Sequence, residues 1–204
     1  ITAGTALNDR LVGLDANVTW LLDGSDQYVS TRSLNFDGFE ILVGGSGVDT
    51  FAIHGSRTYH ALLGGSGADI FEFGSGATLT LTSAGLLAGY IDGQADNDTL
   101  DYSDFTASEP ILVDLPAGTA TNLTNNNPGY VVALVNIETL IGGAGNDRFI
   151  SDTNDNTFFG GAGDDTFVFT DNWGQDKIVD SAGDADFIDL SGITLALTVT
   201  LSSI

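Results

Sequence analysis

One short glycine-rich phrase occurs four times in this chain, each time with an aspartate at its sixth position and a phenylalanine at its eighth. The copies are Gly44-Gly45-Ser46-Gly47-Val48-Asp49-Thr50-Phe51, Gly64-Gly65-Ser66-Gly67-Ala68-Asp69-Ile70-Phe71, Gly142-Gly143-Ala144-Gly145-Asn146-Asp147-Arg148-Phe149 and Gly160-Gly161-Ala162-Gly163-Asp164-Asp165-Thr166-Phe167. Glycines at positions 1, 2 and 4 permit positive φ angles and leave no Cβ in the way, so the chain can turn tightly there. Four such turns in register restrict the fold to a stack of tight turns and short strands.

The aspartate of each phrase gives the turn a chemistry. Its short anionic side chain can aim a carboxylate back into the turn, where the glycines expose backbone carbonyls. Carbonyl and carboxylate oxygens are the hard ligands that Ca²⁺ takes, six to eight of them at about 2.3–2.6 Å. Positions 7 to 9 then predict a short strand whose eighth residue points into the core. Because two nonapeptides would make one full turn of the chain, Asp147 and Asp165 are expected to stack, with a cation between their turns.

This nine-residue pattern resembles the RTX, or hemolysin-type, calcium-binding repeat. The resemblance implies an all-β fold: a right-handed parallel β-helix or β-roll solenoid with Gly-Asp calcium-binding turns and irregular insertions. It implies several bound Ca²⁺ ions as the cofactor. The segments 14–41 and 102–132 contain no glycine-aspartate turn, so we expect strands or hairpin excursions there.

The predicted metal-binding residues are those of the turns. We expect the main carboxylates from Asp49, Asp69, Asp147 and Asp165, and further ligands from Asp98, Asp176, Asp186 and Asn156. Turn carbonyls should complete the coordination shells, at Gly44, Ser46, Gly64, Ser66, Gly142, Ala144, Gly160 and Ala162.

The register of the nonapeptides predicts two columns of sites along opposite edges. Nonapeptides run without a gap over 133–168, and two more fall within 171–189. The four glycine-aspartate phrases should occupy the better edge, and a two-residue bulge should absorb the longer spacing of Asp49 and Asp69. The opposite edge should be chemically poorer, since its sixth positions are Glu138 and Asn156, or Glu40 and His60.

The charge balance agrees with cation binding. The chain has 28 acidic residues against five basic ones, a formal net charge of −23. Of the acids 24 are Asp, at fixed offsets from glycines, which favours turns and oxygen ligands over the alternative of a halophilic acidic surface. Uncompensated charge of this size opposes compaction. It also argues against binding nucleic acid or anionic membranes unaided.

Other classes of protein find no support. There is no cysteine, hence no disulfide or thiolate metal site. No run reaches transmembrane length, so direct membrane insertion is not expected, and no secretory signal is visible. The serines lack a nearby His–Asp pattern and no acid pair stands out, so we predict that the chain is not an enzyme. A metal role for His54 and His60, six residues apart, is disfavoured, and the alternating Thr78, Thr80 and Thr82 are expected to form a solvent-facing strand.

The sequence also repeats over a distance much longer than the nonapeptide. The phrase at 39–45 recurs at 137–143, which predicts solenoid units at 1–98 and 99–187 (calcium turns at 44–52 and 64–72 in the first) and a truncated third unit at 188–204. These units should form one continuous elongated solenoid. Because the chain begins Ile-Thr-Ala-Gly and contains no Met, we expect it to be a piece of a longer polypeptide.

These features predict a calcium-binding structural module of a large secreted or cell-surface bacterial protein: an adhesin, a spacer or an extracellular filament. The module should fold on Ca²⁺ binding after export, and its partners would be calcium and neighbouring copies of the same unit, with self-assembly as a possibility. The alternatives are an accessory or secretion module of an RTX-type secreted enzyme, and a glycan- or ice-binding solenoid.

Overall fold

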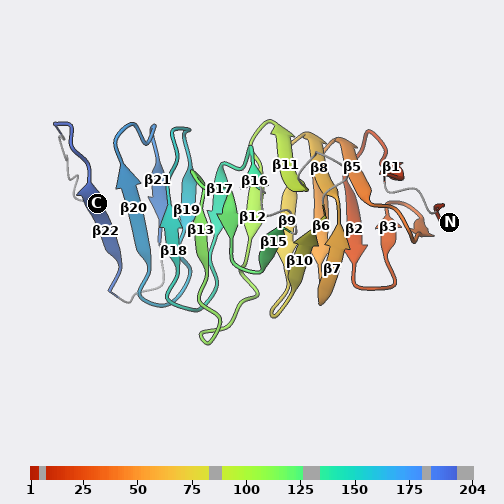
Figure 1. Cartoon of the computed structure of the whole chain (residues 1–204), viewed down its shortest axis with the longest axis horizontal. Coiled ribbons are helices and arrows are strands. Elements are labelled where there is room, and N and C mark those ends of the chain that lie inside the picture. The colour runs from red at the N-terminus through yellow and green to blue at the C-terminus, as the bar shows by residue number, and fades with distance from the viewer. Residues whose placement is uncertain (5–7, 83–88, 126–133, 181–184, 197–204) are drawn as a thin grey trace.

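The computed structural model describes residues 1–4, 8–82, 89–125, 134–180 and 185–196. Across these ranges the chain is all-β, with short strands in four sheets and no helix. The strands lie side by side along one long axis, from β1 near the amino terminus to β22 (Figure 1). Within the described ranges, no segment forms a helix that is long and apolar enough to cross a membrane.

A nine-stranded sheet extends along most of this axis. Its spatial order is β21 (Lys177–Val179), β19 (Thr157–Phe159), β17 (Thr139–Ile141), β12 (Thr99–Asp101), β9 (Ile70–Phe73), β6 (Asp49–Ile53), β2 (Val18–Leu22), β3 (Gln27–Val29) and β4 (Ser33–Asn35). The strands from β21 to β2 pair in parallel, whereas β2, β3 and β4 form antiparallel hairpins.

Two further parallel sheets accompany its amino-terminal half. The N-terminal five-stranded sheet has the order β1 (Arg10–Val12), β5 (Ile41–Ser46), β8 (Ala61–Ser66), β11 (Tyr90–Ala95) and β16 (Leu134–Val135). The three-stranded sheet has the order β15 (Leu123–Asn125), β10 (Thr78–Leu81) and β7 (Ser56–Tyr59). Here the chain visits the three sheets in turn, as in β5, β6, β7 and again in β8, β9, β10.

The carboxy-terminal half uses two sheets instead of three. The C-terminal five-stranded sheet has the order β14 (Thr119–Ala120), β13 (Leu112–Asp114), β18 (Arg148–Ile150), β20 (Thr166–Thr170) and β22 (Phe187–Gly192). From β17 onward the chain alternates between this sheet and the nine-stranded one. A circuit of two strands is shorter than one of three, so equivalent residues such as Phe149 and Phe167 lie closer in sequence.

The core forms from the eighth positions of the phrases, as predicted. Phe51 pairs with Phe71 across neighbouring strands, and both are fully buried. Their rings stack with centroids 5.1 Å apart, and Trp20 continues the stack at 5.6 Å from Phe51. Phe149 and Phe167 repeat the arrangement at 5.7 Å in the C-terminal five-stranded sheet. Aromatic neighbours on one face of a sheet stabilise its register.

The segments without glycine-aspartate turns contain the predicted hairpins. Residues 18–35 form the antiparallel β2, β3 and β4, and β13 and β14 form a second antiparallel pair. Residues 126–132 of the predicted insertion lie outside the described residues, as do 197–204 of the predicted third unit. The prediction of a two-residue bulge between Asp49 and Asp69 was wrong. The offset is constant from Ile41↔Ala61 to Ile53↔Phe73, and the additional length of the circuit contains a third strand, β7.

The three-stranded sheet carries rows of hydroxyl groups on the face opposite its buried leucines. Thr78 pairs with Ser56, and Thr80 pairs with both Thr58 and Thr124. Thr78 Oγ1 donates a hydrogen bond to Ser56 Oγ at 3.0 Å, and Thr124 Oγ1 donates to Thr80 Oγ1 at 3.2 Å. The threonine row predicted at 78–82 is therefore one part of a small hydroxyl grid.

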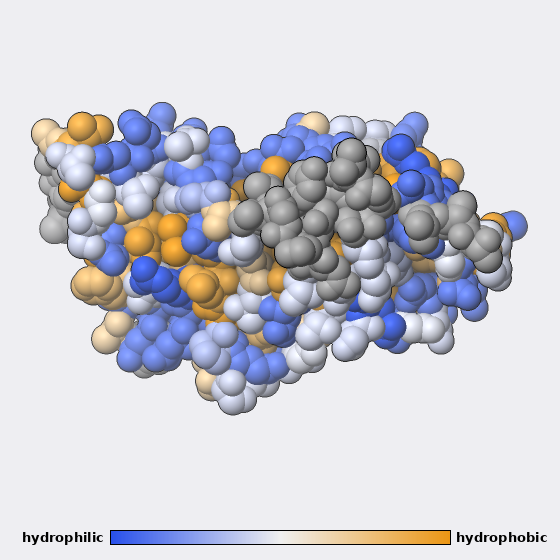
Figure 2. All heavy atoms as spheres, viewed as in Figure 1, coloured by the Kyte–Doolittle hydropathy of each residue, from blue (hydrophilic) through white to orange (hydrophobic). Residues whose placement is uncertain are grey.

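Hydrophilic residues gather where the chain turns between sheets. In the carboxy-terminal half of the face in Figure 2, an apolar region lies between two hydrophilic margins. The strands alternate buried and partly exposed residues, as in Thr166–Thr170, which is the pattern of a sheet with one face on the core. The candidate metal ligands lie at these turns.

Candidate metal centres

Six side chains line up at the starts of consecutive strands of the nine-stranded sheet. We call them the long column: Asp49, Asp69, Asp98, Glu138, Asn156 and Asp176. Hydrogen bonds connect successive rungs. Asp49 N donates to Asp69 Oδ1 at 2.8 Å, and Asp69 N donates to Asp98 Oδ1 at 2.8 Å. Asp98 N donates to Glu138 Oε2 at 3.0 Å, and Asn156 N donates to Asp176 Oδ1 at 2.8 Å.

A second set lies where strands of the C-terminal five-stranded sheet begin. This short column consists of Asp147, Asp165 and Asp186. Ile111 N donates to Asp147 Oδ1 at 2.9 Å, Asp147 N to Asp165 Oδ1 at 2.8 Å, and Asp165 N to Asp186 Oδ1 at 3.0 Å. Both columns follow one rule: one carboxylate oxygen accepts the backbone N–H of the neighbouring turn.

The prediction that all four phrases share one edge was wrong. Asp49 and Asp69 belong to the long column together with Glu138 and Asn156, for which the register predicts the poorer edge. Asp147 and Asp165 belong to the short column. The first two phrases lead into the nine-stranded sheet, whereas the last two lead out of it, because the change from three to two strands per circuit shifts the corner that each phrase occupies.

Glu40 and His60 form a third, separate corner. Asp9 N donates to Glu40 Oε2 at 2.9 Å, and the imidazole Nδ1 of His60 contacts the carbonyl of Thr82. His60 is buried, and its ring packs edge-on to Tyr90. In the described residues this corner contains one aspartate, Asp9, whose Oδ2 is buried without a partner.

The first glycine of each phrase allows carbonyl and carboxylate oxygens to approach one another closely. A Cβ on Gly44 would lie 2.1 Å from Gly64 O and 2.2 Å from Asp49 Oδ2. A Cβ on Gly142 would lie 2.1 Å from Gly160 O and 2.5 Å from Asp147 Oδ2. The turns at Gly44, Gly64 and Gly142 therefore bring the carbonyl oxygen of the next turn and their own carboxylate to one point beside a glycine.

The third positions of the phrases lie beside these points. Ser46 and Ser66 are paired at the ends of β5 and β8. Ala162 N donates to Gly143 O at 3.0 Å, and Ala144 N donates to Phe105 O at 2.9 Å. Their carbonyls remain predicted ligands.

Oxygen atoms without partners indicate where a cation fits. Among the buried oxygens of the described residues that accept no hydrogen bond, four are Oδ2 atoms of the two columns: those of Asp49, Asp69, Asp98 and Asp165. The side chains are at most 1% exposed. Asn156 Oδ1 is also buried and without a partner. Because an unsatisfied buried oxygen is costly, this set of atoms fits a metal ion with oxygen ligands.

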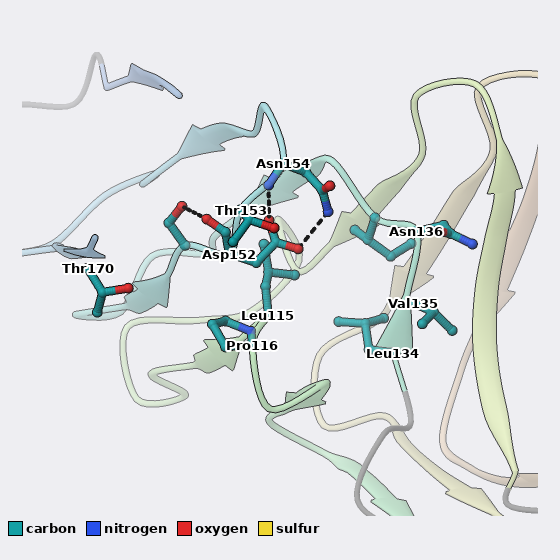
Figure 3. Close-up of a pocket in the computed structure, with 11 residues that line it drawn as sticks. Leu115, Pro116, Leu134, Val135, Asn136, Asp152, Thr153, Asn154 and Thr170 are labelled. Atoms are coloured by element: carbon teal, nitrogen blue, oxygen red, sulfur yellow. Dashed lines mark hydrogen bonds between the residues drawn. The ribbon is translucent and has the colours of Figure 1, made fainter. Parts of the chain in front are cut away.

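The turn that lacks glycines is held by side chains instead. At 151–156, Asn154 N donates to Asp152 Oδ1 at 2.8 Å and Asn154 Nδ2 donates to Asp152 Oδ2 at 2.7 Å (Figure 3). Asn156 Nδ2 also donates to Asp152 Oδ1, at 2.9 Å. A hollow of about 460 Å³ lies beside this turn, also lined by Leu115, Leu134 and Asn136. Sequence reasoning missed Asp152, which occupies a position where the phrases have glycine.

Comparison with protein families agrees with this geometry. The family model described as Peptidase M10 serralysin C terminal matches residues 86–202, which is more than half of the 204-residue chain. The chain belongs to the serralysin C-terminal family. A second model, described as RTX calcium-binding nonapeptide repeat, matches residues 62–78, which include the phrase from Gly64 to Phe71. No curated protein and no solved structure gave a significant match.

Membership in the serralysin C-terminal family, together with the RTX repeat, identifies the ion and the broad fold. RTX nonapeptide repeats bind multiple Ca²⁺ ions, so calcium is the cofactor of this chain, and such repeats imply a β-roll. Neither matched model describes a catalytic domain. Domains of both kinds typify secreted proteins. The chain is thus a calcium-binding module of an RTX protein.

The buried aspartates of both columns have raised pKa values, because burial disfavours their charged forms and most of them lie close to other carboxylates. Burial raises the pKa of Asp49 and Asp69 to about 6, and the neighbouring Asp69 carboxylate adds to the effect at Asp49. Burial raises the pKa of Asp98 to about 7, with further contributions from Asp69 and Glu138. Burial also raises the pKa of Asp165 to about 6. These raised pKa values mean that no positive charge nearby stabilises the ionised carboxylates. A bound cation would supply that charge.

Metal-free protein is expected to lose stability as the pH rises from about 4 to about 7. Below the ordinary aspartate pKa of 3.8, both the folded and unfolded chains are protonated, and the stabilising contribution is complete. Above it the unfolded chain loses protons that the folded chain keeps, and the contribution disappears as the pH passes the folded values near 6 and 7. Thermal unfolding of metal-depleted protein at pH 4.5 and pH 8 measures this. Greater stability at pH 8 would contradict it.

The end of the short column contains an acid that sequence reasoning missed. Carboxylate oxygens of Asp165, Asp180 and Asp186 lie within 4.8 Å of one another. Asp186 is exposed, and the N–H of Asp165 holds its pKa below the ordinary value. Asp180 is the single residue between the nonapeptides 171–179 and 181–189. It has no position in the repeat, so the motif did not indicate it as a ligand.

Proposed function

We propose that Ca²⁺ ions bind along both columns and that the module folds around them after the polypeptide reaches a calcium-rich medium. The observation that carries this proposal is the line of buried Oδ2 atoms without partners, at Asp49, Asp69 and Asp98 in the long column. In each, Oδ1 is occupied by the N–H of the preceding rung, which leaves Oδ2 for a cation.

The proposed ligands are those that the turns bring together. Carboxylates would come from Asp49, Asp69, Asp98, Asp147, Asp165, Asp176 and Asp186, the amide oxygen from Asn156, and carbonyls from the glycine turns beginning at Gly44, Gly64, Gly142 and Gly160. Calcium supplies positive charge there, and it tolerates irregular shells of six to eight oxygens. The chain's own residues orient the carboxylates and hold the turns apart by one strand spacing.

We further propose that the sheets close into a right-handed parallel β-helix with three faces in the amino-terminal half, which continues as a two-faced β-roll from β17 onward. The order in which the chain visits the sheets supports this proposal. The units at 1–98, 99–187 and 188–204 remain a prediction from the longer sequence period.

The biological role follows from the family. The serralysin C-terminal match favours an accessory module of a secreted RTX-type protein over a spacer in a cell-surface adhesin or filament, because that model describes the end of a peptidase. Cell-surface attachment and assembly with neighbouring copies remain predictions. The glycan- or ice-binding alternative would use the hydroxyl grid of the three-stranded sheet, around Thr80.

Isothermal titration of the calcium-depleted chain with calcium tests the binding proposal. We expect several Ca²⁺ ions per chain, with affinities in the range of extracellular modules, about 10⁻⁴–10⁻³ M. Mg²⁺ should not replace them, because it requires near-ideal octahedral geometry and keeps its waters. Equal binding of both ions, or no saturable calcium binding, would contradict the proposal.

A further inference from the structure

A second group of possible metal ligands lies away from both columns. His54, Glu72 and Asp104 each offer one ligand atom, and these atoms all lie within 4.8 Å of one another. His54 directly follows β6, Glu72 lies within β9, and Asp104 lies just beyond the end of β12. These strands are consecutive neighbours in the nine-stranded sheet, with Ala52 paired to Glu72 and Glu72 paired to Asp101. Three successive rungs therefore supply one residue each.

The group lies on the outer face of the sheet. Phe71 and Phe73 are fully buried in the core, so Glu72, between them in the strand, points to the opposite face. His54 and Glu72 are partly exposed and Asp104 is exposed, so an ion can reach all three from solvent. The ligands of the long column lie at the other end of the same strands.

The imidazole of His54 is held in place. A Cβ on Gly74 would lie 2.4 Å from Cδ2 and 3.0 Å from Nε2 of His54, so the ring rests against the glycine backbone. The backbone of His54 is fixed on both sides: its N–H donates to Leu22 O at 2.8 Å, and its carbonyl accepts from Arg57 Nε at 3.0 Å. A ring positioned before the ion arrives loses little conformational freedom on binding.

The surroundings of Glu72 are acidic. Burial, followed by Asp101 and Asp104, raises the pKa of Glu72, and the nearby His54 opposes this. One carboxylate oxygen of Asp101, Oδ1, already accepts a hydrogen bond from the N–H of Ser103 at 2.8 Å. A divalent cation at this place would compensate charge that the surrounding groups leave uncompensated.

We propose that His54, Glu72 and Asp104 bind one Zn²⁺-type transition-metal ion, independently of the calcium columns. A mixed set of imidazole nitrogen and carboxylate oxygens suits Zn²⁺ and its first-row neighbours, whereas Ca²⁺ takes oxygen ligands alone. Three protein ligands leave a fourth position for water. The ion would join three rungs of the sheet and stabilise the folded chain by mass action. His60 is no part of this site, since it is buried at another corner; the sequence analysis disfavoured a metal role for both histidines, and the proposal departs from it at His54 alone.

Histidine NMR on calcium-saturated protein tests the site. The chain has two histidines, so the imidazole signals report on His54 and use His60 as an internal reference. On titration with Zn²⁺ we expect the His54 signals to shift and saturate at one ion per chain, in the presence of excess Ca²⁺, while the His60 signals stay unchanged. An unchanged His54 spectrum, or a shift that excess Ca²⁺ abolishes, would overturn the proposal.

Variants separate this site from general binding of cations by an acidic protein. Glu72→Gln and Asp104→Asn should each weaken Zn²⁺ binding by about tenfold or more, since loss of even an outer-shell partner costs about 10–100-fold. Asp104 is exposed, so its variant should fold normally. Glu109→Gln is the matched control, because Glu109 is partly exposed and bonded to Thr106 and Ser75 instead. Equal Zn²⁺ affinity in Asp104→Asn and Glu109→Gln would also refute the site.

Discussion

In a chelator the chain is expected to lose most of its strand content, and millimolar Ca²⁺ is expected to restore it. The long column places Asp49, Asp69 and Asp98 on consecutive rungs with buried side chains, and within the described residues these carboxylates accept hydrogen bonds from backbone N–H groups only. The whole chain carries a formal net charge of −23, which opposes compaction without cations. Each bound ion contributes about 2.7 kcal/mol to stability when its concentration is a hundredfold above its Kd.

Far-UV circular dichroism in EDTA and then in 10 mM CaCl₂ measures this effect. Sodium chloride at matched ionic strength is the control, since it screens charge without occupying the turns. If sodium chloride restored the strands as well as calcium does, screening rather than site binding would explain the folding. Equal strand content in EDTA and in calcium would disprove calcium-dependent folding altogether.

The substitution Asp69→Asn is expected to have opposite effects with and without calcium. Asp69 Oδ1 accepts the N–H of Asp49, and the amide oxygen of asparagine can keep that hydrogen bond. What the variant loses is the charge at the buried Oδ2. With Ca²⁺ it should unfold more easily, by about 1–3 kcal/mol, the contribution of about one ion at 10–100 times its Kd. Without Ca²⁺ it should be as stable as the parent or more stable, because one uncompensated buried charge is gone.

Three variants resolve the effect, by denaturant unfolding in calcium and by the strand content that remains in chelator. Asp69→Ala removes the acceptor for Asp49 N–H as well, so it should be less stable with and without calcium, by about 1–3 kcal/mol for the unsatisfied donor. Asp23→Asn is the control, since Asp23 is an exposed turn residue that accepts from Ser25 N–H. The idea fails if Asp69→Asn destabilises the metal-free chain as much as the calcium-bound one.

Much of the local structure was predictable from the phrases. The eighth residue is buried at Phe51, Phe71, Phe149 and Phe167, and the sixth residue accepts a backbone N–H from the neighbouring rung. Both features depend on the period-2 alternation of a strand and on the reach of a short carboxylate, which are properties of a few consecutive residues. The hairpins at 18–35 and 112–120 were also expected, because no glycine-aspartate turn interrupts those segments.

The composition of the columns was not predictable in the same way. Linked rungs of the long column lie 20 residues apart at Asp49 and Asp69, 29 at Asp69 and Asp98, and 40 at Asp98 and Glu138. In the short column Asp147 and Asp165 lie 18 apart. The residues of one motif do not indicate how far along the chain the turn that stacks on it lies. The proposed site of His54, Glu72 and Asp104 was missed for the same reason, since its residues come from three rungs.

The sequence by itself determined that this chain makes tight glycine-aspartate turns, buries the aromatic residue two positions later, and carries an excess of oxygen ligands suited to calcium. These properties are local, because backbone freedom at glycine and side-chain alternation act over a nonapeptide. Only the tertiary structure decided which turns share a column. The reason is that stacking depends on the length of each circuit, and a third strand with its insertions changes that length without changing the motif.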